Sequence, residues 1–517
     1  MRMENQWNRK FDAVVLGAGN GGMSGATQLA LSGKNVLMLE QHNILGGFST
    51  SFVRGRFEFE ASLHEICDYG TKDDPGSVGV LFRNLGVELE WASVPEAYRL
   101  IVPEKNIDVV MPFGKREYID ALENYVPGSR PSVTKFLVIA EEISEALAYI
   151  AASKGNPDKK VLLKKYPNFM KTASYSVDEV CRALKMPEDV KNILYAYWCY
   201  VGIPMNRQNF TLFAVMLYKY LIRGAAVPRY RSTAMAESFE QRFRALGGTL
   251  ELNTRVDRIL VENGGVIGVE TASGERIGTR HVLCCASPPR VFSEMVHPKY
   301  EVPPRALKSV NARSIGVSGF VVWLGLDASP EELGISDYSY FIYKDTDTER
   351  LYKDFSSLGR PSVQATVCLN KAIPDCSPAG TTILSMTILY KAEAWKNIEP
   401  ADYFRKKNEI AGYLIEDFEK ATGCNIRDHI EEIDISAPPT YARYTGAYQG
   451  VIYGYEVDSW DSFLPRLMAM KDEVYIRGLR FSSGWGIRTI GYSSALQCGQ
   501  TEAMLTMLDM NNGGVPV

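Results

Sequence analysis

The chain has 517 residues, of which 46% are hydrophobic, and its 61 acidic and 57 basic side chains give a formal net charge of −4. This length is too great for one ordinary core and predicts about two or three domains, while the near-neutral charge argues against a nucleic-acid partner. Nine cysteines without C-x-x-C spacing argue against a disulfide framework, and five histidines outside any cluster with cysteine or carboxylate predict no metal site.

The clearest pattern is a dinucleotide-binding unit over residues 11–47. An apolar run leads into the turn GAGNGG at 17–22, then a small-residue helix, then a second apolar strand that ends at Glu40. Gly17 allows the tight turn, Gly19 lets the backbone approach a pyrophosphate, and Gly22 lets the helix pack close to the sheet. The helix N-terminus attracts the phosphates. Because Glu40 can accept hydrogen bonds from both ribose hydroxyls and would repel a 2′-phosphate, the pattern predicts FAD or NAD in preference to NADP.

A glycine pair and a short hairpin follow this unit and favour FAD. The text from Gly46 reads GGFSTSFVRGRFEFEASLHEI. It resembles the phytoene desaturase, carotenoid isomerase and retinol saturase group of flavoproteins, within the amine-oxidase-like superfamily. In that group a Ser/Thr-rich turn and a G-x-x-F-[DE] hairpin lead to the flavin ring. His64 looks like the histidine that retinol saturases carry after the hairpin. The residues that fit are Gly46, Gly47, Ser49, Thr50, Ser51, Gly55, Phe57, Phe59 and Glu60.

Later segments extend the resemblance to the middle and the end of the chain. Residues 237–271 match a helix, a glycine pair, a short strand and a hairpin with an Asn263-Gly264 turn, and the resemblance implies that the Val256 backbone reads the adenine ring. Residues 281–289 resemble the strand that returns to the FAD sheet, and 473–507 the closing strand, glycine turn and last helix. Arg480 departs from the family's acidic residue; we expect it to contact the pyrophosphate or a substrate carboxylate, with a surface arginine as the alternative.

Together, the motif and the resemblance imply one set of cofactor contacts. These are Gly17, Gly19, Gly21, Gly22, Glu40, Gln41, Gly46, Gly47, Phe48, Ser49, Val256, Ala286, Gly478, Arg480, Gly486 and Ile487.

The predicted fold is α/β, with a discontinuous Rossmann-like FAD-binding domain and an inserted α+β substrate domain. We expect the FAD-binding domain to comprise 1–95, 228–300 and 435–517, and the substrate domain to comprise 96–227 and 301–434. The first inserted piece reads as a mainly helical subdomain, with Ser176 as a helix cap. The second contains the runs VSGFVVWLGL and TTILSMTILY, which predict an antiparallel sheet forming the floor of the pocket.

The most apolar and aromatic stretch is 192–222. Pro204 and a polar run at 206–209 interrupt it, so it is too short to span a membrane. It predicts a pair of core helices and, as a sharper interpretation, the wall of a lipophilic tunnel with a membrane-facing mouth near Lys159-Lys160 and Lys164-Lys165. Because the N-terminus lacks the apolar core of an export signal, we expect a cytoplasmic protein, with peripheral membrane contact as an alternative.

The residues suited to proton transfer are His64 and Glu65, which follow the hairpin, and Tyr453. A flavin carries out the electron transfer itself, so the protein must bind it, orient a substrate carbon and exclude water. A histidine near its unperturbed pKa is a suitable proton donor. The alternative for His64 is a hydrogen-bonded structural residue.

The leading hypothesis is an FAD enzyme that acts on carbon–carbon double bonds of a hydrophobic, polyene or isoprenoid-like lipid, by saturation or desaturation. Redox-neutral cis–trans isomerisation ranks just below it. Amine oxidation, which the same superfold supports, and a non-catalytic flavin-bearing lipid-binding protein are the rivals. Because a second dinucleotide fingerprint is missing, the electron donor or acceptor is not identified by the sequence.

Overall fold

A five-stranded parallel sheet carries the dinucleotide unit. The computed structural model describes residues 7–153, 157–461, 466, 473–486 and 491–513. The predicted order of strand, glycine turn, helix and strand is present as β2, α1 (Asn20–Leu31) and β3. In sheet order the strands are β11 (Thr249–Glu251), β3 (Val36–Leu39), β2 (Ala13–Leu16), β15 (Val282–Cys284) and β22 (Leu479–Phe481).

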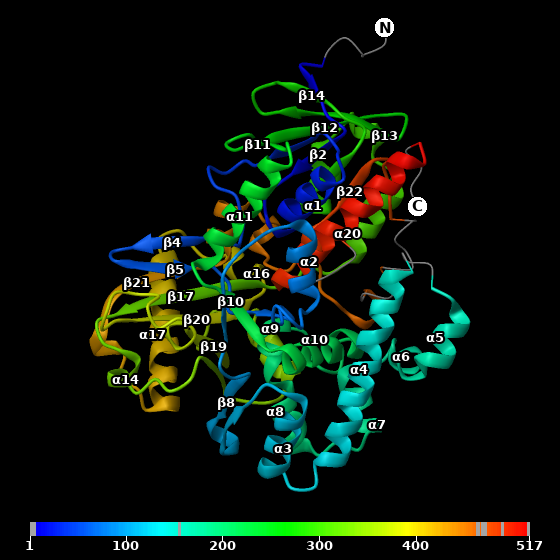
Figure 1. Cartoon of the computed structure of the whole chain (residues 1–517). Helices are drawn as coiled ribbons and strands as arrows, with labels where there is room; N and C mark the ends of the chain where they lie inside the picture. Colours follow the sequence, from blue (N-terminus) through cyan, green and yellow to red (C-terminus); the bar gives the residue numbers. More distant parts are fainter. Residues whose placement is uncertain (1–6, 154–156, 462–465, 467–472, 487–490, 514–517) are drawn as a thin grey trace.

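Helix α20 (Gly491–Asn511) lies beside α1 although the two come from opposite ends of the chain (Figure 1). The two helices approach closely because both carry glycine: a Cβ on Gly499 would overlap the Gly21 carbonyl oxygen. Ser24 Oγ also donates a hydrogen bond to the Leu496 carbonyl oxygen at 2.6 Å. Both chain ends therefore contribute to the core around the parallel sheet.

A second five-stranded sheet contains the predicted hairpin. Strands β12 (Val256–Glu262) and β13 (Gly265–Thr271) pair antiparallel across Asn263 and Gly264, whose φ angles of 53° and 70° suit the tight turn that an Asn-Gly pair favours. This confirms the hairpin. The remaining strands of the sheet are β1 (Arg9–Lys10), β14 (Arg276–Gly278) and β16 (Val296–His297).

A seven-stranded sheet lies apart from the nucleotide half, beside α17 (Tyr403–Thr422) (Figure 1). Its central pair is β17 and β20, the two runs predicted from sequence, which pair antiparallel as expected. The sheet order is β21 (Ile430–Ser436), β17 (Ser318–Leu326), β20 (Thr382–Tyr390), β19 (Val363–Cys368), β18 (Ser339–Tyr343), β8 (Tyr98–Val102) and β9 (Ile107–Met111). Strands β8 and β9 come from a piece expected to be mainly helical, and β8 pairs parallel with β18.

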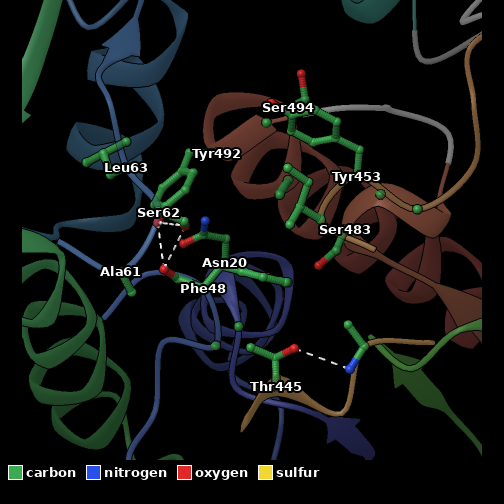
Figure 2. Close-up of a pocket in the computed structure, with 18 of the residues that line it drawn as sticks. Asn20, Phe48, Ala61, Ser62, Leu63, Thr445, Tyr453, Ser483, Tyr492 and Ser494 are labelled. Carbon is green, nitrogen blue, oxygen red and sulfur yellow. Dashed lines mark hydrogen bonds between the residues drawn. The ribbon is translucent and has the colours of Figure 1, made fainter. Parts of the chain in front are cut away.

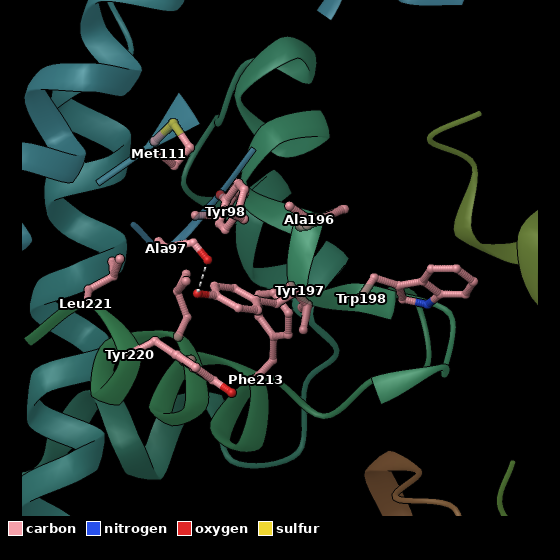
Figure 3. Packing of buried hydrophobic residues seen from close by; sticks show 14 of the residues in the cluster. Ala97, Tyr98, Met111, Ala196, Tyr197, Trp198, Phe213, Tyr220 and Leu221 are labelled. Carbon is pink, nitrogen blue, oxygen red and sulfur yellow. Dashed lines mark hydrogen bonds between the residues drawn. The ribbon is translucent and has the colours of Figure 1, made fainter. Parts of the chain in front are cut away.

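Helices from the first inserted piece share a buried hydrophobic cluster with strands of this sheet. They include α3 (Lys115–Tyr125), α4 (Arg130–Ala152), α8 (Glu188–Leu194), α9 (Trp198–Val201) and α10 (Phe210–Arg223). Ser176 caps α7 (Val177–Ala183) in a capping box with Glu179, as predicted. The stretch 192–222 packs its aromatic side chains into a buried cluster that includes Tyr98, Tyr197 and Phe213 (Figure 3). Among the described residues no helix has both the length and the apolar character needed to cross a membrane.

Candidate functional site

One cavity of about 1710 Å³ lies between the dinucleotide unit and the seven-stranded sheet. Gly19 and Glu40 line it from the nucleotide half, and Val321 on β17 and Thr387 on β20 line it from the sheet. Pockets that hold one drug-sized ligand measure about 300 to 1000 Å³. The cavity therefore has room for a dinucleotide and a second molecule together.

The N-terminus of α1 forms an open cradle in this cavity. Gly19 is the N-cap residue and has no side chain with which to cap the first turn. A Cβ added at Gly19 would meet only the Gly46 carbonyl oxygen, at 3.9 Å, so this position opens toward the cavity. Gly17, with a φ of 95°, makes the turn out of β2. Free N–H groups at a helix N-terminus bind phosphate groups, so the cradle fits a pyrophosphate.

Glu40 stands at the end of β3 with both carboxyl oxygens oriented by backbone donors. The Ala18 N–H donates to Oε2 at 2.7 Å, and the His42 N–H donates to Oε1 at 2.9 Å. Each oxygen keeps a further lone pair for a ribose hydroxyl. Gln41 and Val256 line the cavity beside it. The two acceptor oxygens of Glu40 therefore suit an adenosine with free ribose hydroxyls.

Four more predicted cofactor positions line the cavity: Gly46, Gly47, Phe48 and Ala286. The Phe48 carbonyl oxygen accepts hydrogen bonds from Tyr492 at 2.7 Å and Ser62 at 3.1 Å (Figure 2). These bonds fix the chain where it turns from the glycine pair toward the hairpin.

Five predicted positions pack behind the cavity wall and do not line it: Gly21, Gly22, Ser49, Gly478 and Gly486. A Cβ on Gly22 would overlap the Gly17 carbonyl oxygen, and one on Gly478 would overlap the Arg280 carbonyl oxygen. These glycines therefore allow close backbone packing beneath the site. Ser49 is buried and donates to Asn20 Oδ1 at 2.7 Å. Ile487 lies outside the described residues.

Arg480 was expected to face the pyrophosphate or a substrate, and this expectation is corrected. Its side chain is buried and turned toward α20, where Nε lies 2.7 Å from Asp509 Oδ2 and Nη1 lies 3.5 Å from Glu502 Oε2. It does not line the cavity. A buried guanidinium needs carboxylate partners, and the last helix supplies them. Arg480 therefore joins β22 to α20.

His64, Glu65 and Tyr453 all line the cavity. His64 and Glu65 lie between β5 (Phe57–Glu60) and β6 (Ile66–Cys67). His64 Nε2 is 2.8 Å from Thr387 Oγ1, and its Nδ1 is 3.3 Å from the Tyr200 hydroxyl. The same hydroxyl lies within hydrogen-bond distance of both oxygens of Glu65, at 2.9 and 3.1 Å. The structure thus brings His64 and Glu65 into one hydrogen-bonded group.

Burial moves the pKa values of these two neighbours in opposite directions. It lowers the pKa of His64 to about 4, so the expectation of a histidine near its ordinary pKa is wrong. Burial raises the pKa of Glu65 to about 8, against a smaller lowering by the Tyr200 hydrogen bond. At pH 7 the imidazole is neutral and the carboxyl group is protonated. Glu65 is therefore the stronger proton reservoir of the pair.

Tyr453 reaches the cavity from the segment after α18 (Pro438–Thr445), on the side of Ser483 (Figure 2). Burial raises its pKa, so its phenol stays protonated. Its hydroxyl has no hydrogen-bond partner among the residues that the structure describes.

Tyr200 and Thr387 are functional candidates that the sequence did not single out. Tyr200 lies on α9 within the aromatic stretch 192–222, where one tyrosine is indistinguishable from its packed neighbours. Thr387 lies inside a strand-forming run. Only the pairing of distant elements brings them to His64. The four lysines near a predicted tunnel mouth lie on or at the start of α5 (Lys159–Lys165), which does not line the cavity.

Comparison with known proteins agrees with this site. The family model of flavin-containing amine oxidoreductases matches residues 21–485. All-trans-retinol 13,14-reductase of Danio rerio is 25% identical over 521 residues, covering 94% of this chain and 84% of that protein. Chloroplastic prolycopene isomerase of Daucus carota is 23% identical, covering 86% and 72%. The fold is that of an oxidoreductase structure from Methanosarcina mazei, with a TM-score of 0.62, 14% identity and 96% and 99% coverage. The chain therefore belongs to the family of flavin-containing amine oxidoreductases, and FAD is the cofactor that its dinucleotide unit fits.

Proposed function

We propose that this protein is an FAD-dependent enzyme that saturates or desaturates a carbon–carbon double bond of a polyene or isoprenoid-like lipid. The observation that carries the proposal is a single cavity with a pyrophosphate cradle on one side, an apolar floor on the other, and a hydrogen-bonded carboxyl–imidazole pair in its wall. Similarity to a retinol reductase supports the class of bond.

The residues proposed to hold FAD are those of the cradle and its surroundings. Gly19 and the first turn of α1 would bind the pyrophosphate, and Glu40 with Val256 would bind the adenosine. When bound, FAD supplies two-electron chemistry, and the protein supplies orientation and protons. We also propose that 1–95, 228–300 and 435–517 act as the FAD-binding domain, and that 96–227 and 301–434 act as the substrate domain.

The floor of the cavity suits a long apolar substrate. Gly319, Val321 and Trp323 lie on one face of β17, with Thr387 and Leu389 on the neighbouring β20. Four residues of strand span roughly 13 Å at about 3.3 Å per residue, so this row follows several conjugated double bonds. Apolar burial on such a floor would hold the chain without ionic contacts.

We propose that the substrate enters from an anionic membrane surface at the side of α17 and α18. Phe404 and Tyr444 line the cavity there and are 69% and 56% exposed. Lys407 and Arg443 line it beside them, and neither forms an ion pair with any described carboxylate. Exposed aromatic rings with adjacent bases are typical of surfaces that contact anionic lipid headgroups.

The electron donor or acceptor is proposed to be a transient partner, because the sequence contains one dinucleotide fingerprint. A redox-neutral double-bond isomerase is the second candidate, favoured by the similarity to prolycopene isomerase.

Product mass separates these reactions. Purified holoenzyme with an artificial electron donor is incubated anaerobically with a panel of polyenes, and the molecular masses of the products are measured by mass spectrometry. A gain of two hydrogens identifies saturation, a loss of two with an acceptor identifies desaturation, and an unchanged mass with altered geometry identifies isomerisation. Hydrogen peroxide production from amines in air, with no polyene turnover, would contradict the proposal in favour of amine oxidation.

A further inference from the structure

A chain of hydrogen bonds runs from Glu65 to the cavity surface. The Tyr200 hydroxyl lies 2.9 and 3.1 Å from the two carboxyl oxygens of Glu65 and 3.3 Å from His64 Nδ1. On the far side of the imidazole, Nε2 lies 2.8 Å from Thr387 Oγ1. All four side chains line the cavity. The chain is therefore continuous from a buried carboxyl group to atoms that a substrate would touch.

Three separate elements of the fold hold these four hydrogen-bonded side chains in place. His64 and Glu65 precede β6, Tyr200 is on α9, and Thr387 is on β20. The Tyr338 hydroxyl donates to the His64 carbonyl oxygen, which anchors the segment. The Tyr200 and His64 rings pack edge to face with centroids 5.4 Å apart. Packing therefore fixes the Tyr200 hydroxyl between the carboxyl group and the imidazole.

We propose that Tyr200 is a positioning residue that links Glu65 to His64, so that a proton stored on Glu65 reaches a substrate carbon through the imidazole. This inference rests on the proposed function and identifies the proton path of the same site.

For saturation, bound FAD in its reduced form would supply the hydride for one carbon of the double bond, and an external two-electron donor would supply its electrons. At the other carbon a C–H bond forms as the N–H bond at His64 Nε2 breaks. His64 takes a proton at Nδ1 from Tyr200, Tyr200 takes one from Glu65, and the resulting carboxylate is reprotonated by solvent. The substrate would gain two hydrogens in all, and the two electrons would come from the reduced cofactor.

The electrostatics explain why the proton is stored away from the histidine. Burial lowers the pKa of His64 to about 4, so the imidazole holds no extra proton at pH 7. Burial raises the pKa of Glu65 to about 8, so the carboxyl group does hold one. Burial also keeps Tyr200 protonated by raising its pKa. A neutral chain can then replace the proton that leaves His64 without forming a buried imidazolium ion.

The surroundings of Glu65 preserve its high pKa. No lysine or arginine within the described ranges forms an ion pair with it, and the groups that face it are acids or phenols and thiols. Besides His64 these groups are Cys67, Glu96, Tyr197, Cys199, Tyr200, Tyr220, Tyr338 and Tyr453. Since the store is filled only while Glu65 is protonated, the protonation rate should fall as the pH rises through about 8.

Tyr200→Phe tests the link, with Tyr197→Phe as the matched control. Tyr197 is three residues away, is buried, and donates to the Ala97 carbonyl oxygen outside the chain (Figure 3). Photoreduced holoenzyme is mixed anaerobically with a polyene, and flavin reoxidation is followed between pH 6 and pH 10. We expect Tyr200→Phe to react about 100-fold more slowly, the lower end of general acid catalysis, and to lose the decline near pH 8. Tyr197→Phe should keep the wild-type rate and profile.

An infrared titration tests whether Glu65 holds a proton at neutral pH, without substrate turnover. In oxidised holoenzyme, the carboxylic acid C=O band that disappears in Glu65→Gln should titrate with a midpoint near 8. Because the Tyr200 hydrogen bond lowers the pKa of Glu65, Tyr200→Phe should shift this band and raise its midpoint.

Two results would overturn the inference: a Glu65 midpoint below 6, or a Tyr200→Phe enzyme that keeps the wild-type rate and its decline near pH 8. If no polyene reoxidises the wild-type flavin, the proposed function fails, and the infrared band alone tests the hydrogen bond between Tyr200 and Glu65. A Glu65 band that Tyr200→Phe leaves unchanged would then refute this bond.

Discussion

His64 and Glu65 are adjacent in the chain and share one buried environment. This environment makes His64 a poor base and Glu65 a weak acid. Desolvation disfavours whichever form is charged, so it lowers the pKa of the imidazole and raises the pKa of the carboxyl group. Groups with separated pKa values are typical of sites that move protons. These opposite pKa changes support the proposal that Glu65 stores the proton and His64 delivers it.

Glu65→Gln should change how stability depends on pH. The pKa of Glu65 in the folded protein, about 8, is above the ordinary value of 4.5, so the folded state binds more protons between these values. Its stabilising contribution is complete below pH 4.5 and is lost as the pH rises through 8, by about 1.4 kcal/mol per pH unit within that window. Glutamine carries no such penalty. The unfolding free energy of the variant should therefore increase relative to that of the wild type as the pH rises from 5 to 8.

Urea unfolding of holoenzyme at matched FAD concentrations measures this difference. Glu399→Gln, which removes an exposed carboxylate, serves as the control and should track the wild type. Parallel curves for the wild type and Glu65→Gln would show that the Glu65 carboxyl group is ionised at pH 7, contrary to our expectation.

Gly19→Val should abolish FAD binding while leaving the fold intact. The new side chain would project into the open cradle, where a Cβ meets only one atom within 4 Å, the Gly46 carbonyl oxygen at 3.9 Å. It would occupy the space of the pyrophosphate and not that of the core. Flavin absorbance after reconstitution and far-ultraviolet circular dichroism measure the two effects. Gly412→Val on α17, where a Cβ would also meet open space, should bind FAD normally. Stoichiometric flavin in Gly19→Val would remove the cradle from its proposed role.

At the scale of elements, the last helix is part of the nucleotide half, and Arg480 holds it there. The buried guanidinium on β22 pairs with Asp509 and Glu502 of α20, which in turn packs on α1. Removing one partner of a buried ion pair leaves an uncompensated charge. The pair therefore matters to the stability of α20 and not to contact with the cofactor.

Arg480→Met should lower the unfolding free energy by about 3 to 5 kcal/mol. The FAD dissociation constant of the folded fraction should stay within about threefold of the wild type, since the side chain lies outside the cavity. Chemical unfolding and flavin titration give the two values. Arg477→Met, an exposed change on the approach to the same strand, should cost less than about 0.5 kcal/mol. A large loss of FAD affinity with an unchanged unfolding free energy would indicate instead that Arg480 contacts the cofactor.

Sequence predicted those elements whose signals are local. The strand–turn–helix unit at 11–47, the Asn263-Gly264 hairpin and the Ser176 cap all rest on spacings of a few residues. The β8–β9 pair escaped prediction because β8 pairs with β18, about 240 residues later in the chain. The partners of Arg480 were missed for the same reason, since only folding brings α20 back to β22.

At the scale of the whole molecule, the site is a product of tertiary structure. The cradle comes from the N-terminal unit, the floor from β17 and β20, and the wall beside His64 from α9. The sequence named His64, Glu65 and the cradle through a motif and a resemblance. It could not name Tyr200 or Thr387, because neither stands in a pattern that differs from ordinary packing.

The proposed membrane contact depends on the assembled surface, and Phe404→Ser should weaken it. Phe404 is 69% exposed beside the cavity, so burial of its ring in lipid would be lost. We expect roughly tenfold weaker binding to vesicles that contain anionic lipid. Co-sedimentation measures the change. Tyr300→Ser provides the control, since Tyr300 is 85% exposed but does not line the cavity. Equal losses in both variants, or none in either, would place membrane contact elsewhere.

The most direct test of the account is a single anaerobic turnover, because it asks whether flavin and polyene share the cavity. Photoreduced holoenzyme is mixed with one equivalent of polyene, and the flavin and polyene absorbances are followed together. We predict that the flavin bands return at the rate at which polyene conjugation shortens, with one flavin oxidised for each double bond saturated. A flavin that stays reduced until air is admitted, while every polyene in the panel remains unchanged in mass and geometry, would contradict the account.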